Sequence, residues 1–242
     1  MTPGVQASQT SDSDSDELER RLREVDALRR RVLNVIPHAL RTPITTFRGL
    51  AEALPTASED DIRTSITPAL RRLAAQAERL LDDMLLAAGL TTTLPTSERV
   101  GTMVRPVVDD VWAEVGGGAP LVFEGDDDAA VLAPAGSLSK MLVHVLDNAA
   151  KYGDGTTTVK VVQPGDGSGS TAIVVDSPGA EITEIELLGQ PFFRAEAAVM
   201  RSPGLGVGIA VARALAEHAR GSLTVEARDG GGLITTIELE AV

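Results

Sequence analysis

Apolar residues recur at steps of three and four along the N-terminal part of the chain, which is the spacing of an amphipathic helix. From Glu17 the stripe begins with Leu18 and Leu22 on a background rich in Arg and Glu. This spacing suits a coiled coil, and a solvated amphipathic helix fits the same residues equally well. We predict one long helix over about residues 17–54, kinked where Pro37 and Pro43 each remove a backbone hydrogen bond.

A second helix is predicted over about residues 59–89. Ser58 and the three acids after it suit a helix N-terminus, and Gly89 suits its end. Two antiparallel helices bury their apolar stripes only incompletely, so pairing two chains into a four-helix bundle is the economical solution. We therefore expect a homodimer. The apolar face of this helix consists of Leu70, Leu73, Ala74, Ala77, Leu80, Leu81, Met84, Leu85 and Ala88.

The pattern changes to short Val-rich and Gly-rich segments after residues 91–100, a linker that contains Pro95. Helices and strands in mixed order favour an α/β sandwich with a mixed sheet covered on one face. The chain is thus divided into a helical domain at 17–90 and an α/β domain at 101–242, preceded by an acidic, aperiodic tail at 1–16 that is predicted to be disordered. The predicted helices are 106–115, 138–151 and 206–219, and the predicted strands are 121–124, 130–132, 157–162, 171–176, 222–227 and 233–239.

The amino-acid composition argues against several classes of function. Apolar residues make up 43% of the 242 residues but aromatic residues only 2%, so the cores must consist of Leu, Val, Ile and Ala. A net charge of −13 disfavours nucleic-acid binding and attraction to anionic membranes, because both need a cationic surface. The absence of cysteine excludes disulfides, thiolate metal sites and cysteine nucleophiles. No apolar run approaches the roughly 18 residues that span a bilayer, so we expect a cytoplasmic protein without direct membrane insertion.

His38 lies on the polar side of the first predicted helix, where a histidine is ordinarily only solvated. The surrounding HALRTPITTFRGLAEAL, however, resembles the H box of two-component sensor histidine kinases. The resemblance implies that His38 is the phosphoacceptor and that its phosphoryl group passes to the receiver domain of a response regulator. Thr42, one turn later, matches the position linked to dephosphorylation of the regulator. The acid expected directly after the histidine is replaced by Ala39.

A second group of polar residues lies on the predicted helix 138–151. His144 and Asn148 are four residues apart and share a face, and Lys151 and Tyr152 follow. An amide oxygen can bind Mg²⁺, a lysine can meet a phosphate and a tyrosine can flank a base, although a core helix with a polar face would explain the residues too. LVHVLDNAAKYG is similar to the N box of the GHKL (Bergerat) ATP-binding fold. The similarity implies ATP and Mg²⁺ as cofactors, Asn148 as the Mg²⁺ ligand, nucleotide contacts from Lys151 and Tyr152, and an indirect role for His144 at the metal.

Asp176 closes the apolar strand TAIVVDSPG, where the family places a carboxylate that accepts a hydrogen bond from the adenine amino group. The family pattern D-x-G-x-G becomes Asp-Ser-Pro-Gly-Ala here, which keeps a glycine at Gly179. LLGQPFFRA resembles the F box, which implies Phe193 as a packing anchor and Arg194 as a phosphate contact, with Arg201 a weaker candidate.

The segment GLGVGIAVARALAEHARGSLTVEA resembles the glycine box and the helix behind it. Glycines allow close approach of the backbone, and a helix N-terminus offers free N–H groups to phosphate. The box implies nucleotide contacts from Gly204, Leu205, Gly206, Val207 and Gly208.

The four boxes stand in the order of a histidine kinase core, so the predicted function is autophosphorylation on His38 from ATP. A phosphotransfer adaptor or pseudokinase with weak autokinase activity is the alternative, favoured by Ala39 and the altered Asp-Ser-Pro-Gly-Ala segment. A GHKL ATPase of the chaperone or topoisomerase type is poorly supported, because such proteins lack an H box. The input is expected from a separate sensor protein or from the N-terminal coiled coil.

Overall fold

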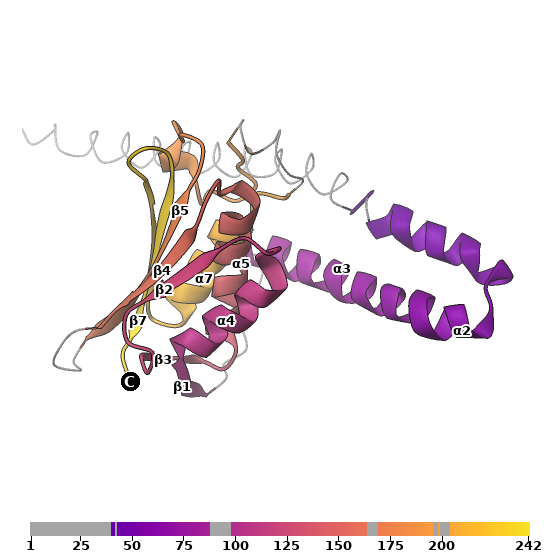
Figure 1. Cartoon of the computed structure of the whole chain (residues 1–242), viewed down its shortest axis with the longest axis horizontal. Coiled ribbons are helices and arrows are strands. Elements are labelled where there is room, and N and C mark those ends of the chain that lie inside the picture. Colours follow the sequence, from indigo (N-terminus) through magenta and orange to yellow (C-terminus); the bar gives the residue numbers. More distant parts are fainter. Residues whose placement is uncertain (1–39, 42, 88–97, 164–168, 196–197, 199–203) are drawn as a thin grey trace, which may run out of the picture. The chain divides into compact units, whose positions relative to one another are not determined.

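The computed structural model describes residues 40–41, 43–87, 98–163, 169–195, 198 and 204–242 (Figure 1). The chain divides between Ile66 and Thr67 into two compact units. His38, Ala39 and Thr42 lie outside the described residues, as do the predicted tail, the predicted helix before residue 40 and residues 91–97 of the predicted linker. Among the described residues, no helix combines the length and the apolar composition needed to cross a membrane.

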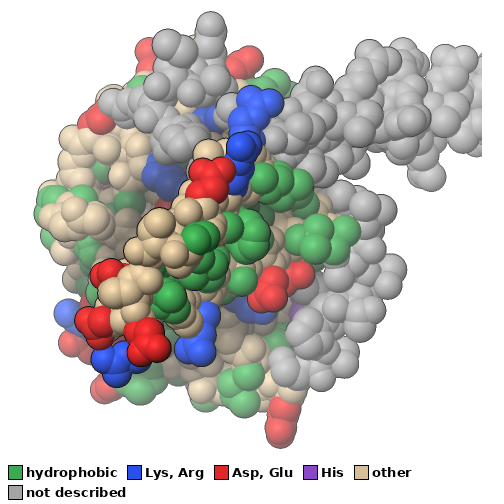
Figure 2. All heavy atoms as spheres, turned by 90° about the vertical axis from the view of Figure 1, so that its right-hand side faces the viewer, with side chains coloured by type: hydrophobic (Ala, Val, Ile, Leu, Met, Phe, Trp, Pro, Cys, Tyr) green, Lys and Arg blue, Asp and Glu red, His purple; other side chains and the backbone are tan. Residues whose placement is uncertain are grey.

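The described part of the first unit is helical. Residues 43–53 form the end of the predicted first helix, and a 3-10 turn at Leu54–Thr56 follows, with Pro55 in its first turn. The apolar stripe of this helix is open to solvent, with Ile44 61% and Phe47 57% exposed. Hydrophobic side chains at the molecular surface are visible in green in Figure 2.

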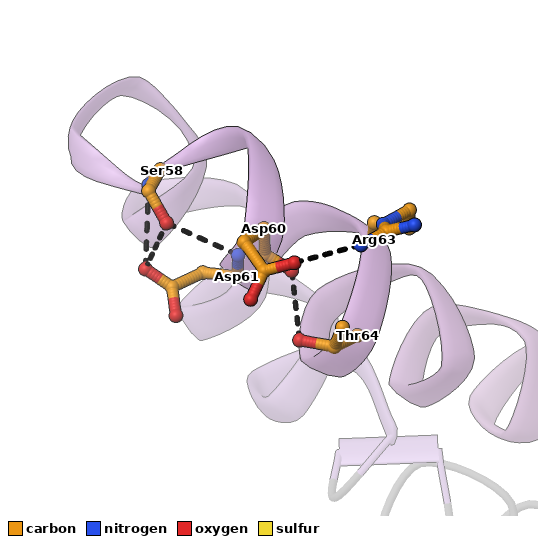
Figure 3. Close-up of polar contacts among 5 residues, drawn as sticks. All are labelled: Ser58, Asp60, Asp61, Arg63 and Thr64. Carbon is orange, nitrogen blue, oxygen red and sulfur yellow. Dashed lines mark hydrogen bonds and ion pairs between the residues drawn. The ribbon is translucent and has the colours of Figure 1, made fainter.

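A capping box starts the next helix, α2 (Glu59–Asp61), as predicted from the acids after Ser58. The Ser58 hydroxyl accepts a hydrogen bond from the backbone N–H of Asp61 (3.1 Å) and donates one to the Asp61 carboxylate (2.6 Å) (Figure 3). The backbone N–H of Ser58 also donates to this carboxylate, at 3.3 Å. These hydrogen bonds from Ser58 hold the pKa of Asp61 below its ordinary value, because they stabilise the ionised form.

The predicted helix at 59–89 contains a π turn at Ile62–Ile66, before α3 (Thr67–Ala87). Pro68 has no N–H to donate to the carbonyl of Thr64, four residues earlier, so the ordinary α-helical bond cannot form there. The hydroxyl of Thr64 donates to the carbonyl of Asp60 (2.7 Å), which also perturbs the helical ladder. Both features favour the wider turn.

A five-stranded mixed sheet organises the second unit. Its order is β2 (Leu121–Glu124), β4 (Thr157–Val162), β5 (Ser170–Pro178), β7 (Gly232–Glu240) and β6 (Ser222–Ala227). β2 and β4 are parallel, and the other neighbours are antiparallel. The predicted mixed sheet is confirmed.

The helices α4 (Val104–Val115), α5 (Ser137–Tyr152) and α7 (Gly208–His218) lie on one face of this sheet (Figure 1). The side chains between the layers are aliphatic, as the composition predicted. Alternate strand residues point toward the helices, and α5 contributes its residues at steps of three and four. The central members of this core are Leu138, Met141, Leu142, Val145 and Leu146 of α5 with Val159, Ile173 and Ile237 of the sheet.

A small second sheet, which the sequence did not predict, joins β1 (Arg99–Met103) to β3 (Ala130–Pro134). Arg99 ties it to the end of the main sheet, since its guanidinium donates to Glu240 of β7 (2.7 Å) and to the carbonyl of Leu132 (2.8 Å). Arg99 and Val100, which the sequence assigned to the linker, are thus part of a strand.

Candidate functional site

One face of α5 carries His144, Asn148 and Tyr152, which succeed one another at steps of four residues. All three are partly exposed, while the opposite face of the helix is buried in the core. In the described part of the chain no hydrogen bond engages the side-chain amide of Asn148. Its oxygen is therefore available to a ligand.

The glycine segment Gly204–Gly208 faces these residues. A Cβ added at Gly208 would lie 3.6 Å from Nδ1 of His144, and one added at Gly204 would lie 3.6 Å from the hydroxyl of Tyr152. Gly208 is also the first residue of α7, whose first turn has backbone N–H groups without partners in the helix. The partly exposed face of α5 and the positive end of a helix dipole thus meet at one place, which suits an anionic ligand.

Gly206 fixes the shape of this segment. Its φ is +69°, and a Cβ there would overlap the carbonyl oxygen of Phe193 and lie 2.8 Å from Cγ of Arg194. The carbonyl of Gly206 accepts a hydrogen bond from the N–H of Phe192 (2.9 Å). Leu205 and Val207 on either side are buried, so only their backbone can reach a ligand.

The neighbouring F-box segment differs from its prediction in one respect. Phe192 is the buried aromatic residue, 5% exposed, whereas Phe193, the predicted anchor, is only half-buried. Phe192 has a φ of 63°, which is unusual for a bulky residue. Arg194 donates to the carbonyl of Ala198 (2.6 Å) and has Nε 4.0 Å from the Cβ position of Gly204, so its guanidinium borders the glycine segment. Arg201 lies outside the described residues.

Two predicted site residues lie beside carboxylates. Nζ of Lys151 is 2.6 Å from the carboxylate of Asp147, one turn earlier on α5. Nε2 of His144 is 3.4 Å from Asp83 of α3, within the same compact unit, while its Nδ1 faces Gly208. Lys151 must leave Asp147 to meet a phosphate.

Asp176 lies apart from the other predicted residues. Thr171, Ile173 and Val175 point toward the helices, so Asp176 points to the opposite face of β5. There its carboxylate accepts a hydrogen bond from Nε of Arg228 (2.6 Å). The structure therefore does not bring Asp176 together with Asn148 and Tyr152.

Gly179, by contrast, lies beside the end of α5. It forms an isolated bridge with Gly153, the residue after Tyr152, and a Cβ on Gly179 would lie 2.8 Å from the carbonyl oxygen of Tyr152. Ser177, which the sequence reasoning passed over, is on the helix-facing side of β5 and only 8% exposed. No sequence signal marks its face, because apolar residues stand on both sides of this strand.

Cation ligands are few at this site. Among the described residues there is no group of three or more His, Asp or Glu side chains that could hold a metal ion. A cation here would depend on Asn148 and on oxygens supplied by a bound anion, which is the usual arrangement for Mg²⁺ with a nucleotide.

Comparison with protein families matches two models in succession. Residues 28–92 match the His Kinase A (phospho-acceptor) domain, and residues 134–242 match the histidine kinase-, DNA gyrase B- and HSP90-like ATPase. The second match covers β4, β5, β7 and β6 of the main sheet, the α5 face and the glycine segment, so it implies ATP binding by this domain.

The similar proteins include sensor proteins. The chain is 29% identical over 235 residues to sensor protein KdpD of Mycobacterium tuberculosis, covering 89% of this chain and 26% of that protein. It is 28% identical over 249 residues to sensor protein CutS of Streptomyces coelicolor, covering 98% of this chain and 58% of that protein. The chain thus spans about a quarter of the length of KdpD and somewhat over half of the length of CutS.

Among solved structures, the Acinetobacter baumannii histidine kinase AdeS matches with a TM-score of 0.56 and 19% identity, over 84% of this chain and 97% of that one. The full-length ShkA structure with AMPPNP matches with a TM-score of 0.59 and 20% identity, over 87% of this chain and 45% of that one. At these identities the likeness concerns the fold.

Proposed function

The chain belongs to the sensor histidine kinases of two-component systems, and from this premise we propose that it transfers the γ-phosphoryl group of ATP to His38 and then to an aspartate of a response regulator receiver domain. The cytoplasm is the proposed compartment, since ATP and the regulator are found there.

The observation that carries the proposal is the meeting of α5 and the glycine segment. His144 and Tyr152 lie against Gly208 and Gly204, with Asn148 between them on the same face of α5, and the first turn of α7 begins at Gly208. Phosphoryl transfer depends mainly on positioning and charge neutralisation, for which the backbone N–H groups of that turn and the guanidinium of Arg194 are suited. Lys151 adds a cation once it leaves Asp147.

The site also suits Mg²⁺ bound together with the nucleotide. Asn148 offers an amide oxygen that no described residue engages, and the phosphates supply the remaining charge. Bound there, Mg²⁺ would neutralise charge on the phosphate oxygens. His144 touches Gly208 from the side of α5 and would support the metal site indirectly.

The helical domain is proposed to form a homodimer and to bind the regulator. Ile44, Phe47 and Leu81 are each more than half exposed in the single chain, as expected for an apolar stripe that a second chain would cover. Thr42, one helical turn after His38, is proposed to orient the water that dephosphorylates the regulator. A separate sensor protein is proposed to supply the signal.

The second candidate is a phosphotransfer adaptor that binds the regulator but has little autokinase activity. It is favoured by Ala39, which puts a methyl group where relatives carry the acid next to the phosphoacceptor. This candidate predicts nucleotide binding without autophosphorylation.

The deciding experiment incubates the purified protein with Mg²⁺ and γ-labelled ATP. We expect label that is labile to acid and stable to base, as phosphohistidine is, and we expect none in His38→Gln. His218→Gln is the matched control, because His218 is at the far end of α7 and outside the site.

The possible outcomes separate the candidates. Acid-labile label that persists in His38→Gln would refute the assignment of the phosphoacceptor. ATP binding without any label in the wild-type protein would favour the adaptor.

A further inference from the structure

The direction of the side chains on β5 decides which residue of this strand can meet a bound nucleotide. Successive residues of a strand point to opposite faces. Thr171, Ile173, Val175 and Ser177 are buried against the helices, and the residues between them are half-buried on the other face. Asp176 belongs to that other face, away from α5 and α7.

Asp176 is also engaged where it lies. Its Oδ1 accepts a hydrogen bond from Nε of Arg228 at 2.6 Å, and both side chains are about one-third exposed, at 39% and 31%. Its backbone is paired with Ile234 of β7, within a ladder that continues to Pro178 and Gly232. Turning Asp176 to the helix side would require a one-residue slip of this whole ladder.

Ser177 is next to the candidate site. A Cβ added at Gly153, the residue after Tyr152, would lie 3.0 Å from the Ser177 hydroxyl. No hydrogen bond to this hydroxyl is found within the described part of the chain, although the residue is 8% exposed. Its ladder partner on β7 is Leu233, also 8% exposed, which offers an apolar surface beside the hydroxyl.

Tyr152 connects Ser177 to the glycine segment. Its hydroxyl lies 3.6 Å from the position of a Cβ at Gly204. Its carbonyl oxygen lies 2.8 Å from the position of a Cβ at Gly179, two residues after Ser177. A nucleotide with its phosphates at the glycine segment and its base along Tyr152 therefore ends beside Ser177 and Leu233.

Given the proposed ATP site, on which this inference rests, we infer that Ser177 is the residue of β5 that meets the purine base and that it gives the site weak selection between adenine and guanine. A carboxylate only accepts hydrogen bonds, so it favours the adenine amino group and repels the O6 oxygen of guanine. A serine hydroxyl donates as well as accepts, so it satisfies either base. The ligand class is thus a purine nucleoside triphosphate, with GTP accepted beside ATP.

The test is calorimetric titration of the full chain with Mg–ATP and Mg–GTP, for the wild type, Ser177→Asp, Ser177→Ala and Asp176→Asn. We expect wild-type affinities for the two nucleotides within about tenfold of each other, and a gain of at least about tenfold in the ATP:GTP ratio for Ser177→Asp. Ser177→Ala should lose about fivefold in affinity for both, the effect of one hydrogen bond. Asp176→Asn, the matched control on the other face, should shift neither affinity by more than about twofold.

The results separate this inference from the proposed function. If the wild type binds neither nucleotide, both are refuted. If ATP binds but Asp176→Asn weakens it tenfold while Ser177→Ala does not, Asp176 meets the base and the inference alone is wrong. A wild-type preference for ATP of a hundredfold or more also overturns it. Should Ser177→Asp fail to fold, as judged by circular dichroism, the Ser177→Ala and Asp176→Asn pair still decides.

Discussion

Replacing Gly206 with alanine should damage the site more than the same change at Gly208, two residues later. The φ of +69° at Gly206 costs an L-residue about 1–2 kcal/mol. The added Cβ also overlaps the carbonyl oxygen of Phe193, and the resulting shift would break the hydrogen bond from Phe192 to Gly206, which contributes about 1 kcal/mol. The expected loss of unfolding free energy is about 2–3 kcal/mol in total.

Gly208→Ala is the matched control. Its Cβ would meet His144 at 3.6 and 3.7 Å, which is ordinary van der Waals contact, and its φ is not positive. Alanine is the better helix former, so this variant of the first residue of α7 should change the stability by no more than about 0.5 kcal/mol, or raise it.

Urea unfolding followed by the fluorescence of Trp112 measures both variants. Trp112 is the single tryptophan and lies on α4, in the same domain as the glycine segment, so the signal reports on that domain. With a slope of about 2 kcal/mol/M, the midpoint should fall by about 1–1.5 M in Gly206→Ala and by less than about 0.3 M in Gly208→Ala. Equal midpoints in the two variants would refute the prediction, because the positive φ and the close approach at Gly206 would then not require a glycine there.

Three further predictions concern other parts of the chain. Asn148→Ala should abolish Mg²⁺-dependent ATP binding and leave the melting temperature of the apo protein within a few degrees; unchanged ATP affinity in calorimetry would remove Asn148 from the site. Ala39→Glu should speed single-turnover autophosphorylation at least about tenfold by restoring a base beside His38, and equal rates would mean that the chain does not need that acid. Ser58→Ala should lower helix stability by about 1 kcal/mol at neutral pH. Ser58 lowers the pKa of Asp61, so the stability that the Asp61 carboxylate adds to the helix cap is fully present above the ordinary pKa of Asp61. It is lost as the pH falls through the lowered pKa. Thermal melting followed by circular dichroism should therefore show a smaller effect of Ser58→Ala in strong acid.

Elements with a clear period were predicted closely from the sequence. The helix predicted at 138–151 is Ser137–Tyr152, and the strands predicted at 121–124, 157–162 and 222–227 have those bounds in the structure. In each case the apolar period and the flanking turn residues point to the same structure. β1 was missed because Arg99–Met103 is short, contains a glycine and gains its pairing only from β3, about thirty residues later.

The face of Asp176 could not be read from the sequence. TAIVVD has apolar residues on both faces of the strand, so hydrophobic alternation does not reveal which side is buried. The pairing of β5 with β4 and β7 fixes the register, and its partners on β7 are more than fifty positions away. The helical spacing of His144 and Asn148, by contrast, is local, and it correctly predicted a shared face, which in the structure also carries Tyr152.

The π turn at Ile62–Ile66 marks a place where this chain could lose one residue without disturbing the helix that follows. Such a turn accommodates one residue more than an α-helical turn, so the residues after it keep the helical register that they would have without the extra residue. Deleting one residue from this turn should therefore restore a regular helix without rotating the apolar face of α3. When this chain is aligned with shorter relatives, a gap of a single residue is expected within 62–66, whereas a one-residue insertion within α3 would turn every later side chain by about 100°.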